Sequence, residues 1–152
     1  MSGCTAVVDT NVFVHALFYE DENCLKIMDM VENNELNLLF SRDTIGELMY
    51  ILKNFSRHNL DENEGIELLQ NIAELFYTSK SYNDSKISPN TLPKDPDDIM
   101  FLKCAIKGNA DYLITNDLKS GLIKLTEYDF IGITAKDFIE GFGEDIQEDE
   151  VS

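Results

Sequence analysis

Several features that place proteins in specialised classes are scarce in this sequence. No apolar run approaches the ~18–20 residues needed to cross a bilayer, and the opening MSGCTAVVDTN lacks the basic region and cleavage site of a signal peptide. Cys4, Cys24 and Cys104 are widely spaced with no C-x-x-C pair, so neither a disulfide framework nor a cysteine zinc site is expected. We therefore expect a cytoplasmic protein with reduced thiols and no membrane contact.

Histidine and basic residues are also few. His15 and His58 are too far apart to form a ligand pair by spacing, and we expect structural roles for both. Lys and Arg number 12 against 29 Asp and Glu, a net charge of −17, which argues against a protein that binds nucleic acid by broad phosphate neutralisation. Residues 143–152 carry acids and no base, and we expect them to form a flexible acidic tail that accounts for part of this charge.

The remaining residues, 1–142, fit one domain, because 152 residues with 43% hydrophobic side chains supply one sizeable core. Apolar spacing predicts strands at 5–8, 36–41, 111–115 and 130–134, helices at 11–19, 22–33, 42–55, 61–77, 96–107 and 135–142, and a long loop from Thr78 to Lys94. Strands that alternate with helices predict an α/β fold with a mainly parallel sheet and helices on both faces. In such sheets ligands gather beyond the carboxyl ends of the strands.

Two aspartates follow predicted strands at this edge. Asp9 ends the run AVVD, and Asp117 lies two residues after the strand at 111–115. An ionised carboxylate directly after a buried strand costs free energy unless it is paired, capped or bound to a metal. Both residues also have a structural interpretation: Asp9 as the N-cap of the helix that begins near Asn11, and Asp117 as an Asx-turn residue.

Two further acids lie near predicted helix starts. Glu47 ends the sequence TIGE, which fits a capping box with Thr44 as N-cap, but it lies a turn inside the helix if the helix begins near Arg42. Asp98 ends the sequence DPDD, where acids are favoured by the helix dipole. Asp98 also shares helical spacing with apolar residues at 101, 102 and 105, whereas Asp97 is rotated by about 100° toward solvent.

Taken together, the four acids favour a metal site over four separate caps. The predicted fold brings strand ends and helix starts to one edge of the sheet, and helix capping alone would not require this convergence. Carboxylate oxygens suit Mg²⁺ or Mn²⁺, and the absence of nearby His or Cys disfavours zinc.

The chain resembles the PIN-domain nuclease family, which includes many prokaryotic toxin ribonucleases. The resemblance covers most of the chain in the right order, in five segments: VVDTNVFVHAL (7–17), SRDTIGELMYIL (41–52), DPDDIMFLKCA (95–105), ADYLITND (110–117) and ITAKDFIEGF (133–142). The acids of the family pattern match Asp9, Glu47, Asp98 and Asp117. Its polar positions match Asn11, Thr115 and Asn116.

This resemblance implies a single PIN-like domain with about five parallel strands and a nuclease that hydrolyses phosphodiester bonds in RNA. The four acids would hold one or two Mg²⁺ or Mn²⁺ ions, and Asn11, Thr115 and Asn116 would orient water or phosphate. Scattered bases, Arg42, Lys94 and Lys119, are candidates for phosphate contact. The resemblance also suggests an antitoxin protein or a second copy of the chain as partner, although the 61–77 helix, the following loop and the negative charge disfavour the toxin role.

Other classes fit the sequence less well. A catalytically silent PIN scaffold, which binds RNA or protein, is favoured by the acidic surface and disfavoured by the complete set of acids. A haloacid-dehalogenase-like phosphatase would need D-x-D at residues 9–11, where the sequence reads Asp-Thr-Asn. A phospho-receiver domain would need a lysine after the strand at 111–115, and none is present at the required place.

Overall fold

The structure, a computed structural model, describes residues 4–78, 80–82, 99–118, 121–124 and 128–141. The elements in chain order are β1 (Cys4–Val8), α1 (Thr10–Phe18), α2 (Glu22–Glu32), β2 (Leu36–Ser41), α3 (Arg42–Asn59), α4 (Glu62–Thr78), β3 (Lys80–Tyr82), α5 (Ile99–Lys107), β4 (Tyr112–Ile114), the 3₁₀ turn η2 (Leu122–Lys124) and β5 (Ile131–Ile133). Residues 135–141 form a further helix. No helix among the described residues is long and apolar enough to span a bilayer.

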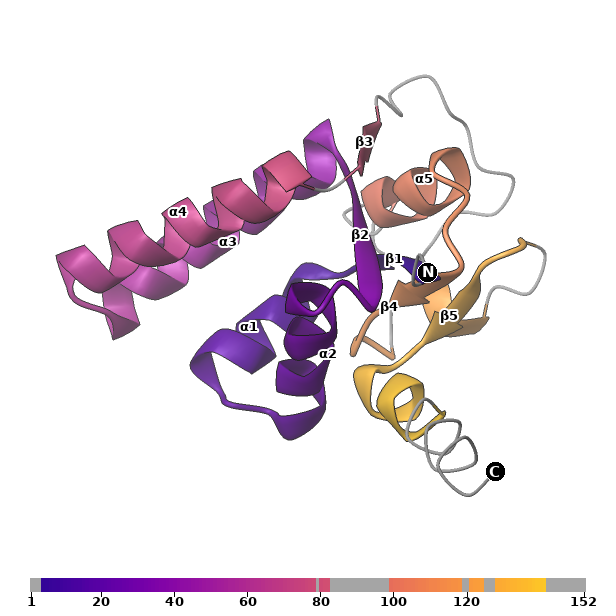
Figure 1. The fold of residues 1–152 in the computed structure, drawn as a ribbon, viewed down its shortest axis with the longest axis horizontal. Helices are drawn as coiled ribbons and strands as arrows, with labels where there is room; N and C mark the ends of the chain where they lie inside the picture. Colours follow the sequence, from indigo (N-terminus) through magenta and orange to yellow (C-terminus); the bar gives the residue numbers. More distant parts are fainter. Residues whose placement is uncertain (1–3, 79, 83–98, 119–120, 125–127, 142–152) are drawn as a thin grey trace.

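All five strands belong to one sheet with the order β3-β2-β1-β4-β5, and every neighbouring pair is parallel (Figure 1). This confirms the expected five-stranded parallel sheet. β1 lies at the centre: Ala6 pairs with Leu38 of β2 on one side and with Tyr112 of β4 on the other. The chain therefore leaves β1 toward one edge of the sheet and later returns to the other side of β1, a strand-order reversal that creates a crevice at the carboxyl ends.

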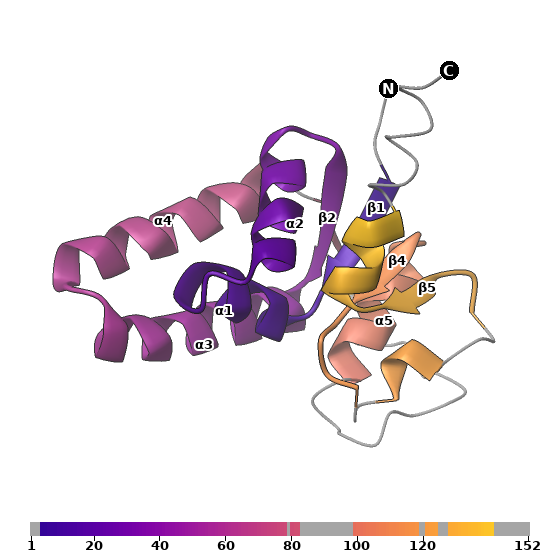
Figure 2. The same cartoon turned by 90° about the horizontal axis from the view of Figure 1, so that it is seen from below.

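The two faces of the sheet carry separate apolar cores because side chains alternate along each strand. On one face, strand residues such as Ala6, Val8 and Ile114 pack with α1, α2, α3 and the 135–141 helix. On the other face, Val7 and Leu113 pack with α5 and η2. Helices on both faces were expected from the alternating pattern, and both layers are visible in Figure 2.

The helices α3 and α4 form a long hairpin that projects away from the sheet in both views (Figures 1 and 2). The two helices approach closely near the turn, where a Cβ on Gly65 would lie 3.5 Å from the Ser56 hydroxyl oxygen. The turn is closed by the expected Asp61 cap: the Glu64 N–H donates to Asp61 Oδ1 at 2.8 Å. The hairpin places one face of α3 in solvent along its whole length.

Three sequence expectations need correction. Residues 80–82 form the edge strand β3, although the segment 78–94 was expected to be loop throughout. Helix α3 continues to Asn59, four residues beyond the predicted end, and ends where the Leu60 N–H still donates to Ser56 O. Its N-cap is Ser41, which forms a capping box with Thr44, so the box predicted between Thr44 and Glu47 is wrong.

Other expectations hold in the described part of the chain. The three cysteines are free thiols, two of them buried. Thr134 caps the last helix, because its hydroxyl accepts from the Asp137 N–H at 3.2 Å. Gly132 of β5 must be glycine for a packing reason: an added Cβ would lie 2.4 Å from Leu122 O, so its absence lets η2 cover this strand.

Candidate functional site

Asp9 follows β1 at the carboxyl edge of the sheet and is 6% exposed. It occupies the N-cap position of α1, but its side chain makes no capping hydrogen bond. Its carboxylate is held from elsewhere: Thr115 Oγ1 donates to Oδ2 at 2.7 Å, and Asn11 Nδ2 donates to the same oxygen at 3.1 Å. The capping interpretation of Asp9 therefore does not explain why a carboxylate is buried at this position.

The electrostatic setting of Asp9 opposes its charge. Burial raises the pKa of the Asp9 carboxyl above its ordinary value, and the nearby charge of Asp117 raises it further. The Thr115 hydroxyl acts in the opposite direction, and so do the backbone N–H groups of Asn11 and Thr10, which lie near the carboxylate without the geometry of a capping hydrogen bond. All of these donors are neutral. Within the described part of the chain the hydrogen bonds therefore solvate the negative charge without balancing it, and a bound cation would complete this environment.

Thr115 links the two strand ends. It is fully buried directly after β4, and its N–H donates to Ile133 O at 3.0 Å. Besides donating to Asp9, its hydroxyl oxygen accepts from the Asp117 N–H at 3.1 Å and from Asn11 Nδ2 at 3.4 Å. One side chain therefore fixes the position of the Asp9 carboxylate and the backbone of Asp117.

Asn116 ties this edge to three helices. Its N–H donates to Asn11 Oδ1 at 3.1 Å, and its own Oδ1 accepts from the Ala135 N–H at 3.2 Å. Because Ala135 fixes Oδ1 as the acceptor, the amide nitrogen faces His15 Nδ1 at 2.9 Å and Cys24 Sγ at 3.4 Å. Asn116 thus sets the spacing of α1, α2 and the 135–141 helix around the site.

His15 and Thr10 are residues at this site that the sequence argument did not select. His15 was expected to have a structural role, and its Nδ1 is placed to accept from Asn116, which leaves the ring proton on Nε2. The helical spacing could have indicated His15, because it lies one turn after Asn11 on the same face of α1. Thr10 gave no such signal.

Glu47 lies in the second turn of α3, since this helix begins at Arg42. It is half-buried, and the Thr10 hydroxyl donates to its Oε2 at 3.1 Å. Thr10 directly follows Asp9, so this contact brings Glu47 to the start of α1. Of the two placements left open by the sequence, the one with Glu47 inside the helix is the one observed.

Asp98, with Asp97, lies outside the described residues. Helix α5 is described from Ile99, and the positions predicted to share a face with Asp98 are buried, namely Phe101, Leu102 and Ala105. The helix leads into β4, so its start lies toward the carboxyl edge of the sheet, as expected for a crossover helix.

The donor set at this edge fits a hard divalent cation. Carboxylates from Asp9, Asp117 and Glu47, with hydroxyl and amide oxygens beside them, are the ligands that Mg²⁺ and Mn²⁺ prefer. Within the described residues, no three acidic, histidine or cysteine side chains are close enough to hold an ion by themselves. A metal here would therefore need a further protein ligand, water or substrate oxygens.

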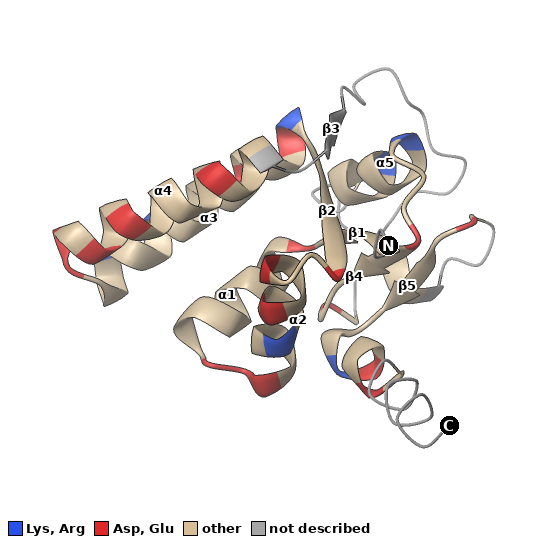
Figure 3. Cartoon of the chain, viewed as in Figure 1, with Lys and Arg blue, Asp and Glu red and all other residues tan. Residues whose placement is uncertain are grey.

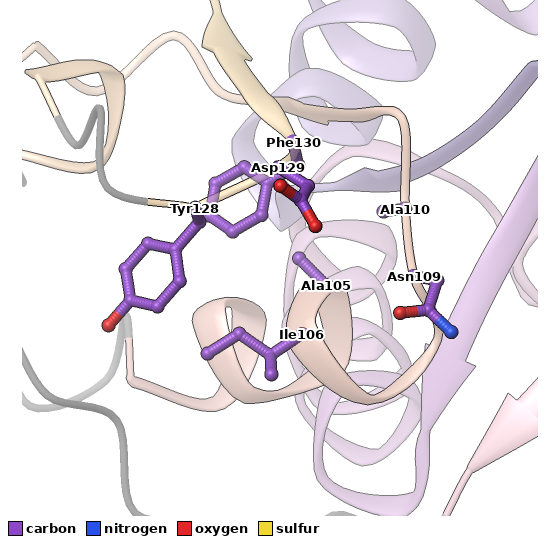
Figure 4. Close-up of a pocket in the computed structure, with 7 residues that line it drawn as sticks. All are labelled: Ala105, Ile106, Asn109, Ala110, Tyr128, Asp129 and Phe130. Atoms are coloured by element: carbon purple, nitrogen blue, oxygen red, sulfur yellow. The ribbon is translucent and has the colours of Figure 1, made fainter.

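A separate cavity of about 200 Å³ lies at the opposite, amino edge of the sheet (Figure 4). It is lined by residues that precede β4 and β5, including Asn109, Asp129 and the parallel rings of Tyr128 and Phe130, whose centroids are 5.4 Å apart. None of the predicted site residues lines it.

Comparisons with known proteins agree with the fold described above. The family model of the PIN domain matches residues 5–119. Among solved structures, the chain is similar to a chain in the crystal structure of VapBC2 from Rickettsia felis bound to a DNA fragment from its promoter, with a TM-score of 0.52 and 17% sequence identity. That match covers 86% of this chain and 98% of the other, and at this identity it shows the fold alone. A search of curated protein sequences finds no match. Because the family model covers more than half of the sequence, the chain belongs to the PIN-domain family, whose members are generally nucleases.

Proposed function

We propose that this protein is a Mg²⁺- or Mn²⁺-dependent endoribonuclease with Asp9, Glu47, Asp98 and Asp117 as its metal-holding carboxylates. The observation that carries the proposal is the state of Asp9. A carboxylate that is 6% exposed, whose hydrogen bonds from the described residues all come from neutral donors, and that lies close to a second carboxylate is costly for the fold. It is explained if the position serves a cation.

Each polar residue has a role in this proposal. Asp9 and Asp98 would be direct ligands, and Asp117 and Glu47 would bind directly or through water. Thr115 holds Asp9 in place, and Thr10 holds Glu47, through the hydrogen bonds of 2.7 and 3.1 Å. Asn11 and Asn116 would orient water or a phosphate oxygen. When bound, the ions would lower the pKa of a water molecule and offset charge on the leaving oxygen.

The biological role we favour is RNA cleavage in the cytoplasm, with the toxin of a toxin–antitoxin pair as one setting. The structurally similar Rickettsia felis chain comes from a VapBC2 complex on promoter DNA, and this supports an antitoxin as a partner. A second copy of the chain is the other partner we propose. The acidic C-terminal residues 143–152, which lie outside the described part of the chain, would act as a flexible tail.

The alternative is a catalytically silent module that binds RNA or protein, and the net charge of −17 favours it. The two functions differ in metal dependence. Purified full-length protein should cleave a labelled single-stranded RNA with Mg²⁺ or Mn²⁺, stop in EDTA and recover when metal is restored. The Asp9→Asn variant is the control against a contaminating nuclease. Cleavage that persists after complete metal removal, or that Asp9→Asn retains, would reject the metal mechanism.

A further inference from the structure

One exposed face of α3 carries basic residues although the protein as a whole is strongly acidic. Arg42, Gly46, Tyr50, Lys53 and Arg57 follow one another at spacings of four, four, three and four residues, so they share one side of the helix. All five are exposed, and Tyr50 is 65% exposed although it is a large aromatic residue. We name these five residues the α3 stripe.

The α3 stripe is positive, whereas the partner helix α4 is negative. The exposed charged residues of α3 are Arg42, Lys53 and Arg57 against one acid, Asp43. Both arginines of the whole chain are among them. The partner helix α4 carries four exposed acids and no base, Glu62, Glu64, Glu67 and Glu74, and Figure 3 shows acids along α4 and a base at the start of α3.

The α3 stripe begins at the proposed active site and leads away from it. Helix α3 starts directly after β2, the strand beside β1, so Arg42 and Asp9 lie at the same edge of the sheet. Glu47 follows Gly46 in the helix, and Tyr50 lies one turn beyond Glu47. From Arg42 to Arg57 the helix rises by about 22 Å. A stacked single strand of about six nucleotides covers the same length, at ~3.4 Å per nucleotide.

Gly46 is an independent sign of an approaching ligand. A glycine inside a helix costs about 1 kcal/mol relative to alanine. At Gly46 neither the backbone conformation nor the packing requires a glycine. Its backbone is not in the left-handed region, and a Cβ built on it meets no atom within 4 Å. The missing side chain leaves the helix backbone open next to Glu47, where a substrate would pass.

Two acids limit how far the positive surface extends. Asp61 and Glu62 line a hollow together with Lys53 and Arg57 at the far end of the hairpin. The Asp61 carboxylate is engaged by the Glu64 N–H at the start of α4. The positive surface of the α3 stripe therefore ends near Arg57.

We infer that the α3 stripe is the track on which a single-stranded RNA lies as it enters the site, an inference that rests on the proposed RNA-cleaving function. Arg42, Lys53 and Arg57 contact phosphates, and one base stacks on the ring of Tyr50. Basic side chains combined with an exposed aromatic ring are the general means of holding single strands without reading their sequence. Confining these contacts to one helix face lets a protein of charge −17 bind a polyanion.

The binding test uses full-length protein, a fluorescein-labelled 12-nucleotide oligouridine and EDTA, with anisotropy measured across a salt series. Lys53→Gln/Arg57→Gln should weaken binding and make the slope of log K against log salt shallower by about 1.4, because each phosphate contact with a single strand contributes about 0.7. The matched control, Lys26→Gln/Lys107→Gln, removes two exposed lysines from α2 and α5 and should leave the slope unchanged.

The stacking contact has its own pair of variants. Tyr50→Ala should weaken binding about tenfold, which corresponds to ~1.4 kcal/mol. Tyr50→Phe should keep most of the affinity because the ring remains. All five residues substituted in these variants, namely Lys26, Tyr50, Lys53, Arg57 and Lys107, are exposed, so circular dichroism and melting temperature should match the wild type.

The cleavage test separates the track from the chemistry. With Mn²⁺, the Lys53→Gln/Arg57→Gln variant should cut a 20-nucleotide RNA more slowly than wild type but hydrolyse bis-p-nitrophenyl phosphate equally, since this small diester cannot reach the α3 stripe. Wild type that binds oligouridine but hydrolyses neither substrate would reject the proposed nuclease and leave the track supported. The track is rejected if the wild type cleaves RNA and the stripe variants bind and cleave RNA as the control variant does. It is also rejected if the wild type binds no oligouridine. In either case a protein partner would be the occupant of this face.

Discussion

Replacing Thr115 with valine keeps the shape of a fully buried side chain and removes the hydroxyl that holds Asp9. A hydrogen bond to a charged group contributes ~1.5–3 kcal/mol, and the Asp117 N–H, which donates to the same hydroxyl at 3.1 Å, also loses its acceptor. We therefore expect Thr115→Val to lower the free energy of unfolding by about 3 kcal/mol in metal-free buffer at neutral pH. For a domain of this size the melting temperature should fall by ~6–12 °C.

The loss of stability in Thr115→Val should depend on pH, because the Thr115 hydroxyl acts on the pKa of Asp9. Its hydroxyl favours the ionised carboxylate and so lowers the pKa of Asp9, against the larger effect of burial, which raises it. The stabilisation by Thr115 is therefore largest when Asp9 is ionised and decreases as the pH falls through the titration of Asp9. The destabilisation caused by Thr115→Val should be smaller at about pH 4 than at about pH 8.

The matched control is Thr5→Val, near the amino end of the central strand β1. The Thr5 hydroxyl donates to Asp111 Oδ2 at 3.2 Å in an exposed position, where the loss should stay below about 1 kcal/mol. Urea unfolding followed by circular dichroism at the two pH values measures both variants. The reasoning is refuted if Thr115→Val costs no more than Thr5→Val, or if its cost does not change with pH.

Three other predictions concern the acids. In metal-free buffer, Asp9→Asn should raise the melting temperature at neutral pH, because a carboxyl whose pKa is raised by burial and by Asp117 costs stability once the pH exceeds that pKa; the gain should disappear in acid, where Asp9 is protonated in both states. In RNA-cleavage assays, Asp98→Asn should lose at least ~100-fold in rate while Asp97→Asn loses much less, because helical spacing directs only position 98 along the buried face. Deleting residues 143–152 should leave the melting temperature unchanged and raise the cleavage rate at ~10 mM salt, with the difference shrinking at ~150 mM as screening shortens from roughly 30 to 8 Å.

Most of the fold was predictable because its main elements are long and periodic. The apolar spacing in α3 and α4 and the β-branched run of β1 gave the right element type, and β2 has the predicted bounds, Leu36–Ser41. The edge strand β3 was missed because its three residues sit in a polar segment without alternation. Its pairing with β2 is a tertiary contact that local sequence does not encode.

The location of Asp9 at the end of β1 and of Glu47 inside α3 was predictable from the sequence, but the contacts that hold their side chains were not. An acid directly after a buried strand, such as Asp9 after β1, is recognisable from the sequence because of its position. The N-cap of α3 was left open by the sequence because two hydroxyl residues, Ser41 and Thr44, compete for it, and Thr44 fills the reciprocal role that a glutamate usually has. Contacts such as His15 with Asn116, which are 101 positions apart, depend on the assembled sheet.

Because Asp9 after β1 is held by Thr115 after β4, the site cannot form during synthesis until β4 and Thr115 have been made. Asp9 and Thr115 are 106 positions apart, and at ~5–20 residues per second a ribosome needs roughly 5–20 s to make the intervening chain. During that interval the emerging polypeptide gains the α3–α4 hairpin and the proposed ligands Glu47 and Asp98, but it still lacks the Thr115 hydroxyl and Asp117. If the chain cleaves RNA as we propose, its site is therefore incomplete while the first three quarters of its own message are being translated.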